Sequence, residues 1–180
     1  MRLVPTRQAV ALTGLTTAKL REWTSRRALI PADVPPKAQG SPAQYSWQTI
    51  LLLRLAVTLR DRFHLELQAH QSLFASLRCG LRDKSFIAIW EKTLALHGGE
   101  RWSFLEVEEA LEPGEDAILI RLAPHLSILA AGFALPQPAA PLGQLDLFPA
   151  LAISGSRTKP TARTADLAPP SPFGRRQRTG

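Results

Sequence analysis

The sequence has 180 residues and a mass of 19.8 kDa, which is enough for one compact domain or two small ones. Apolar residues make up 45% and charged residues 21%, which excludes a chain that is disordered throughout. The single cysteine, Cys79, excludes an internal disulfide and a cysteine-rich zinc module. No apolar signal-peptide core follows Met1, and Arg121 and Pro124 interrupt the longest apolar run. We therefore expect a cytoplasmic protein with no membrane partner.

Basic residues are concentrated at the two ends of the chain, whose net charge is +7. Residues 1–62 alone carry a net charge of +7, whereas residues 63–135 carry −4 and residues 136–180 carry +4. A basic N-terminal segment is typical of proteins that bind nucleic acids. This distribution predicts a nucleoid-associated protein whose N-terminal part contacts double-stranded DNA.

The first 27 residues predict two helices joined by a tight turn. Thr6 is a candidate N-cap for a helix that includes residues 8–12, and Gly14 can adopt the positive φ of a turn. Thr16 is a candidate N-cap for a second helix, residues 17–27, with its apolar positions on one face. A helix, a glycine-containing turn and a helix together indicate a helix-turn-helix.

The next segment contains too many prolines for a helix. Residues 31–44 hold four prolines and one glycine, so we expect either a loop or a short, irregular β-hairpin. Ser46 is a candidate cap for a strongly apolar helix, residues 47–62, and a further helix is predicted at residues 65–78.

A second unit is predicted over residues 81–135. Its expected elements are an amphipathic helix at 85–96 and three strands at 102–107, 117–122 and 127–133, which form a meander. Eight prolines among residues 136–180 predict a disordered tail. We therefore predict a mainly α fold with a DNA-binding domain at 1–80, a small α+β unit at 81–135 and the tail.

No catalytic motif is present, so we expect neither an enzyme nor a cofactor. The four histidines show no metal-ligand spacing, and the sequence has no nucleophile elbow and no phosphate-binding loop. The acidic residues between positions 106 and 116 lack the spacing of a calcium loop, which favours a solvated rim over a metal site.

Residues 10–31, VALTGLTTAKLREWTSRRALIP, resemble the N-terminal module of the MerR family of transcription regulators. That family carries a run of the form A-x-L-T-G-V-S-x-x-T-L-R-x-Y/W…G-L-I-P, followed by a winged loop, an R-x-Y-S step and a long helix. Here Tyr45 and Ser46 precede the predicted helix 47–62, which fits the same order. Phage excisionases and terminase small subunits have related winged helices.

The resemblance implies a recognition helix, residues 16–27, in the major groove and a wing along the DNA backbone. Thr16, Thr17 and Lys19 suit contacts with base edges and phosphates, and Arg21 would hold a phosphate. A basic, solvated helix in a small bundle remains the alternative. The predicted DNA-binding residues are Thr16, Thr17, Lys19, Arg21, Arg26, Arg27, Lys37 and Tyr45.

The chain departs from the family pattern at several positions. Glu22 replaces an aromatic residue, and Ala43 replaces the arginine of the wing. No heptad repeat follows residue 81, so a long dimerising coiled coil is absent from the sequence. A homodimer is therefore expected to form through residues 81–135 or 65–77, unless residues 81–135 bind an effector instead.

A short motif in the predicted tail resembles the pentapeptide with which bacterial replication and repair proteins bind the β sliding clamp. Its residues are Gln144, Leu145, Asp146, Leu147 and Phe148, and they match the form Q-L-(S/D)-L-F. An apolar segment that folds back on the core is the alternative interpretation.

Three hypotheses for function follow from the sequence. The first is a bacterial transcriptional regulator that reads duplex DNA through a winged helix-turn-helix. The second is a replication, repair or recombination accessory factor that is tethered to the clamp. The third is an interaction protein whose helix-turn-helix no longer contacts DNA.

Overall fold

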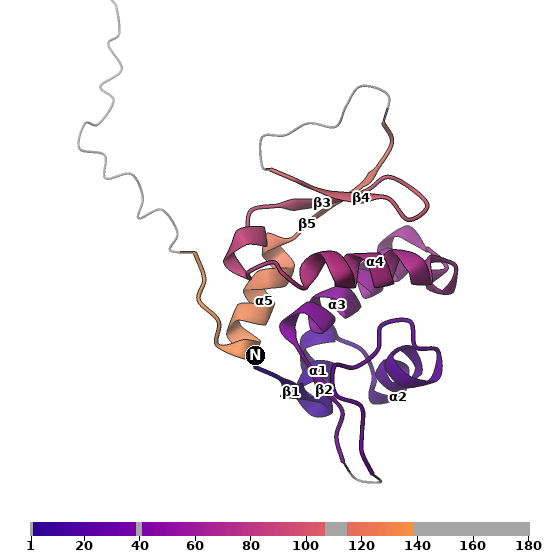
Figure 1. Cartoon of the computed structure of the whole chain (residues 1–180), viewed down its shortest axis with the longest axis vertical. Helices are drawn as coiled ribbons and strands as arrows, with labels where there is room; N and C mark the ends of the chain where they lie inside the picture. The colour runs from indigo at the N-terminus through magenta and orange to yellow at the C-terminus, as the bar shows by residue number, and fades with distance from the viewer. Residues whose placement is uncertain (1, 39–40, 107–114, 139–180) are drawn as a thin grey trace, which may run out of the picture. The chain divides into compact units, whose positions relative to one another are not determined.

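The computed structural model describes residues 2–38, 41–106 and 115–138 (Figure 1). Within these ranges the chain is mainly helical, as expected from the sequence, and it carries two small antiparallel sheets. The helices are α1 (Thr6–Thr13), α2 (Thr17–Arg21), α3 (Trp47–Phe63), α4 (Gln71–Leu81) and α5 (Ala123–Phe133). The strands are β1 (Val4–Pro5), β2 (Gln44–Tyr45), β3 (Thr93–Leu96), β4 (Trp102–Leu105) and β5 (Ile118–Arg121). The predicted tail lies outside the described residues, except for positions 136–138.

Helix α3 is the centre of the hydrophobic core. It packs against α1, α4 and α5 (Figure 1). Most of its apolar side chains are buried, and Phe63 at its end is exposed. Its N-terminus is capped by Ser46, whose Oγ accepts a hydrogen bond of 3.2 Å from the Thr49 N–H. The predicted helix 47–62 and its cap are confirmed. Trp47, at the start of α3, is buried.

Helices α1 and α2 follow one another across a short turn, and residues 6–26 are called the helix-turn-helix segment below. Gly14 ends α1 with a φ of 74°, a conformation that favours glycine, and the Thr16 Oγ1 caps α2 by accepting from the Lys19 N–H. The predicted cap at Thr6 is wrong, because Pro5 occupies the N-cap position of α1 and has no side chain that could accept a hydrogen bond.

The second helix changes its winding before it ends. A π-helical turn, η1 (Glu22–Arg26), continues α2. The predicted helix 17–27 therefore consists of an α-helical part and a π-helical part. Trp23 and Thr24 are adjacent in the sequence and both buried, whereas Ser25 and Arg26 are exposed. The wide turn therefore places two consecutive residues in the core and the next two at the surface.

Residues 33–38 and 41–45 form the two sides of an irregular hairpin, which is called the wing below; positions 39–40 lie outside the described residues. Val34 and Gln44 pair across it, and β2 continues into an antiparallel pair with β1. Asp33 anchors its base, since its carboxylate accepts from the Ser46 N–H at 2.6 Å and pairs with Arg78 of α4 at 3.1 Å. The base of the wing is thus fixed to the N-terminus of α3 and to α4.

The C-terminal part of the described chain differs from the prediction in two elements. The expected helix 85–96 is instead a short 3₁₀ turn, η3 (Ile87–Ile89), followed by β3, the central strand of the sheet β4-β3-β5. The expected strand 127–133 is part of α5. The strands predicted at 102–107 and 117–122 correspond to β4 and β5, and the helix predicted at 65–78 corresponds to η2 (Leu67–His70) and α4.

The hydrophobic core continues across the predicted boundary at residue 80. Helix α5 packs on α1 and α3, and Gly132 approaches Leu12 so closely that a Cβ at position 132 would lie 2.4 Å from its side chain. Two hydrogen bonds join the same elements, from Arg2 to the Phe133 carbonyl at 2.7 Å and from Gln8 to the Gly132 carbonyl at 2.6 Å. The helix-turn-helix segment therefore depends on α5 for part of its packing.

Candidate nucleic-acid interface

The exposed side of α2 carries short polar and cationic side chains. Thr16, Thr17 and Arg21 are exposed, and the buried Leu20 and Trp23 hold the opposite side of the helix against the core. The Thr16 hydroxyl oxygen is used by the cap, but its proton remains available as a donor. This side of the helix has the chemistry that contacts with bases and phosphates require.

Arg21 and Arg26 face the wing. Together with Ser25 they border a groove of about 300 Å³, whose other wall is formed by wing residues that include Pro36 and Ser41. Within the described ranges, neither of the two guanidinium groups makes a hydrogen bond or an ion pair. Both charges are therefore available to an anion that lies between the helix and the wing.

Lys19 and Arg27 have a different environment, because Glu22 pairs with both of them. The Glu22 carboxylate lies 3.0 Å from the Lys19 Nζ and 2.8 Å from the Arg27 Nε. The hydrogen bond from Lys19 and the charge of Arg27 lower the pKa of Glu22, which keeps the carboxylate ionised. Two of the predicted DNA-binding cations are thus partly neutralised.

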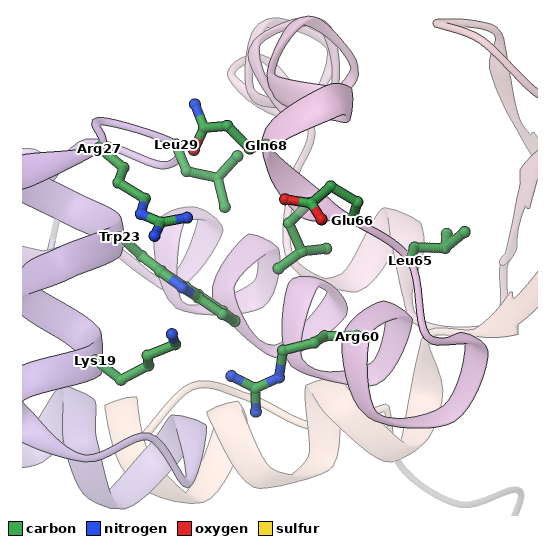
Figure 2. Close-up of a pocket in the computed structure, with 9 residues that line it drawn as sticks. Lys19, Trp23, Arg27, Leu29, Arg60, Leu65, Glu66 and Gln68 are labelled. Atoms are coloured by element: carbon green, nitrogen blue, oxygen red, sulfur yellow. The ribbon is translucent and has the colours of Figure 1, made fainter.

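Lys19 and Arg27 also lie near Trp23, together with Arg60 of α3. Figure 2 shows Lys19, Arg27 and Arg60 gathered about the indole, where they line a cavity of about 170 Å³. The Arg60 guanidinium lies 5.1 Å and the Lys19 ammonium 6.0 Å from the ring centroid, which are distances of cation–π contacts. Trp23 is 3% exposed and belongs to the core.

The structure thus divides the predicted DNA-binding residues into groups. Thr16, Thr17, Arg21 and Arg26 share the outer surface of the helix, and Lys37 is exposed on the wing. Tyr45 is 1% exposed and its hydroxyl lies 3.5 Å from the Thr24 Oγ1, so it belongs to the core and borders the groove only from beneath. We use the name α2–wing surface for Thr16, Thr17, Arg21, Ser25, Arg26 and the wing.

One cation near the helix was not selected from the sequence. Arg60 belongs to α3, 33 positions after Arg27, and only the fold brings it to Trp23. The concentration of positive charge in residues 1–62 includes Arg60, but spacing within a single helix could not identify its position. The predicted clamp-binding residues 144–148 lie outside the described residues.

Metal sites and membrane-spanning helices were sought in the part of the chain that the structure describes. In those ranges no group of three or more His, Cys, Asp or Glu side chains could hold a metal ion, and no helix is long and apolar enough to cross a membrane. Comparisons with protein-family models, with curated proteins and with solved structures gave no match. The surface geometry and the sequence motifs are therefore the basis for a functional assignment.

Proposed function

We propose that the chain is a bacterial transcriptional regulator that binds duplex DNA through the α2–wing surface. The observation that carries this proposal is the position of Arg21 and Arg26, two cations on the exposed side of the capped second helix that border a groove shared with the wing. A helix with short polar side chains at its N-terminus suits the major groove, and a neighbouring hairpin suits the DNA backbone.

The backbone at the end of the second helix also supports the resemblance to the MerR family. Ala28 stands at the position of the glycine in the family's G-L-I-P run, and its φ is 47°, in the left-handed region that favours glycine. Leu29 and Ile30, which follow, are buried as a turn toward the core requires. A glycine would adopt the φ of Ala28 without strain, which supports the alignment of this residue with the glycine of the motif.

A salt titration of the full chain tests the proposal. Binding of a fluorescent duplex, followed by anisotropy, should weaken linearly on a log–log scale as the salt concentration rises, because each neutralised phosphate releases counterions. A selected duplex should bind more tightly than a random one if the threonines of α2 reach base edges. Absence of salt-dependent binding at low ionic strength would exclude DNA as the partner and favour an interaction protein.

Removal of the Glu22 charge is expected to strengthen DNA binding. The substitution Glu22→Gln releases Lys19 and Arg27 from their ion pairs, so both can approach phosphates. We expect a several-fold higher affinity and a salt dependence steeper by about one to two units. The control is Glu91→Gln, which makes the same change in net charge at an exposed position far along the chain. Equal effects of the two substitutions would assign the gain to net charge alone.

A second candidate function is supported by the motif QLDLF at 144–148. We propose that a replication or repair factor with this motif would bind the β sliding clamp through Leu147 and Phe148 as apolar anchors, with the Gln144 amide fixing the register. A peptide that orders on binding is expected to reach micromolar affinity, about −8 kcal/mol.

The clamp interaction has a direct test in the full chain. The double substitution Leu147→Ala and Phe148→Ala is expected to abolish binding to a purified clamp in a calorimetric titration and to leave DNA binding unchanged. Asp146→Ser is the control and should retain clamp binding, because the pentapeptide form accepts either residue at this position. If the wild-type chain shows no binding at hundreds of micromolar clamp, the motif is coincidental and transcription control is the remaining proposal.

A further inference from the structure

A cavity of about 500 Å³ lies between α3, β5 and the start of α5. One wall is formed by Arg54, Thr58 and Arg62, which are spaced four residues apart and therefore share one face of α3. The other walls are formed by β5 and by the first turns of α5. This volume falls within the range of about 300–1,000 Å³ that is typical of small-molecule sites.

Exposed apolar side chains collect around this cavity. Among the described residues, the large apolar side chains that remain exposed are Phe63, Ile87, Leu119 and Ile128, with exposed fractions between 41% and 49%. All of them except Ile87 line the cavity. Single exposed apolar residues are ordinary at a protein surface, but a group of them around a hollow is typical of a binding site.

The polar side chains of the cavity are basic. Arg54, Arg62 and Arg121 line it together with His125, and no acidic residue of the described chain is part of its lining. Burial and the charges of Arg54 and Arg62 lower the pKa of His125 to about 4, so the imidazole is neutral at pH 7. The cavity is therefore electropositive, with no carboxylate from its described walls to balance the arginines.

Two buried nitrogen atoms at the cavity lack hydrogen-bond partners in the described structure. They are the Nε of Arg54 and the Nδ1 of His125. The Arg54 guanidinium donates one hydrogen bond, to the Leu12 carbonyl at the end of α1, which leaves its Nε unsatisfied. Unpaired buried polar groups are unfavourable, so these two atoms show that the polar side of the cavity is not fully satisfied by the described residues.

We propose that this cavity binds a small organic carboxylate with an apolar body. The carboxylate would pair with Arg62 and Arg121, which present planar, multidentate donors, and the apolar body would cover Phe63, Leu119 and Ile128. A neutral apolar ligand would leave the arginines unpaired, and an inorganic anion would leave the apolar side chains exposed. The inference is independent of DNA binding, because the site shares no residue with the α2–wing surface.

The test uses 8-anilinonaphthalene-1-sulfonate, a fluorescent amphipathic anion, with the full chain. We expect one saturable site, from which octanoate and 1-naphthoate displace the probe and the neutral octanamide and 1-naphthamide do not. The two acids distinguish an aliphatic body from an aromatic one. Displacement by the amides at the same concentrations as the acids would overturn the role of the arginines.

Matched substitutions locate the site. Ile128→Glu places a negative charge at the cavity and should weaken binding of the better acid at least tenfold, whereas Ile87→Glu, at an equally exposed isoleucine outside the cavity, should not change it. Arg121→Gln should weaken binding of the acid about tenfold. Arg101→Gln, at an exposed arginine outside the cavity, should leave this binding unchanged.

Near-UV circular dichroism verifies that each variant is folded. If Ile128→Glu does not fold, Arg121→Gln still tests whether the acid binds in this cavity. If each control substitution weakened binding of the acid as much as its partner in the cavity, the proposal would be overturned. Sedimentation identifies the competing occupant, since a wild-type dimer that Ile128→Glu converts to a monomer would show that a second copy covers this face.

Discussion

Replacing Phe133 by alanine is expected to lower the free energy of unfolding of the folded region by about 3–5 kcal/mol, the usual cost of truncating a fully buried phenylalanine. Phe133 is 0% exposed at the end of α5, which packs on α1 and α3. The loss of stability should extend to the helix-turn-helix segment, because Arg2 and Gln8 donate hydrogen bonds to carbonyls at this end of α5.

Urea denaturation combined with amide hydrogen exchange measures this effect. The unfolding midpoint should decrease in a single transition, and the amides of α1 and α3 should lose protection together with those of α5. Ile128→Ala removes an apolar side chain from the exposed face of the same helix and should change stability by no more than about 0.5 kcal/mol. Unchanged protection of α1 and α3 in the Phe133 variant would show that residues 2–80 fold independently.

The double substitution Arg21→Ala and Arg26→Ala is expected to weaken DNA binding about 100-fold near 0.1 M salt. Each phosphate contact contributes about one unit to the salt dependence, which is close to a factor of ten in affinity at this concentration. Both side chains are exposed beside the wing, so their removal should not affect the core. The proposed interface therefore predicts a large loss of affinity at little cost in stability.

Anisotropy titrations at several salt concentrations check this result. The double variant should show a salt dependence lower by about two units, and its preference between a selected and a random duplex should persist. Arg82→Ala combined with Arg101→Ala removes the same charge from exposed positions elsewhere and should have a much smaller effect. Similar losses for the two double variants would assign binding to net charge and not to the α2–wing surface.

Elements with strong local signals could be predicted from the sequence. Thr16 and Ser46 cap α2 and α3 as expected, because a hydroxyl before an amphipathic run satisfies the free N–H groups of the first turn. The turn at Gly14 was predicted for a similar reason, since its positive φ favours glycine. Each of these signals depends on residues that lie within four positions of one another.

The order of elements after residue 85 depends on tertiary contacts, and here the prediction failed. Residues 94–96 are all buried because β3 is the central strand between β4 and β5, so their apolar run carries no alternation that would distinguish a strand from a helix. The burial of Leu126, Leu129 and Phe133, at intervals of three and four residues, does fit a helix. That spacing was present in the sequence, but the apolar residues between these positions obscured it.

The candidate interface was predicted in composition but not in arrangement. Sequence spacing placed Lys19, Arg21 and Arg27 on one basic helix. The three-residue spacing of Lys19 and Glu22 is compatible with an ion pair on a helix, but the five-residue spacing of Glu22 and Arg27 is not a regular helical pair. The π-helical turn η1 sets the directions of the side chains after Arg21, including Arg26 and Arg27, and no local sequence motif predicts such a turn.

The hydrogen bonds between the N-terminal segment and α5 have a consequence for biosynthesis. Arg2 and Gln8 leave the ribosome early, yet their acceptors lie 131 and 124 positions later in the chain. At about 5–20 residues per second, translation separates these partners by roughly 6–26 s. During that interval the apolar side of α1 that later contacts α5 has no native partner. The nascent chain should therefore recruit chaperones at its N-terminal segment, and this segment should mature only after the last described helix has been synthesised.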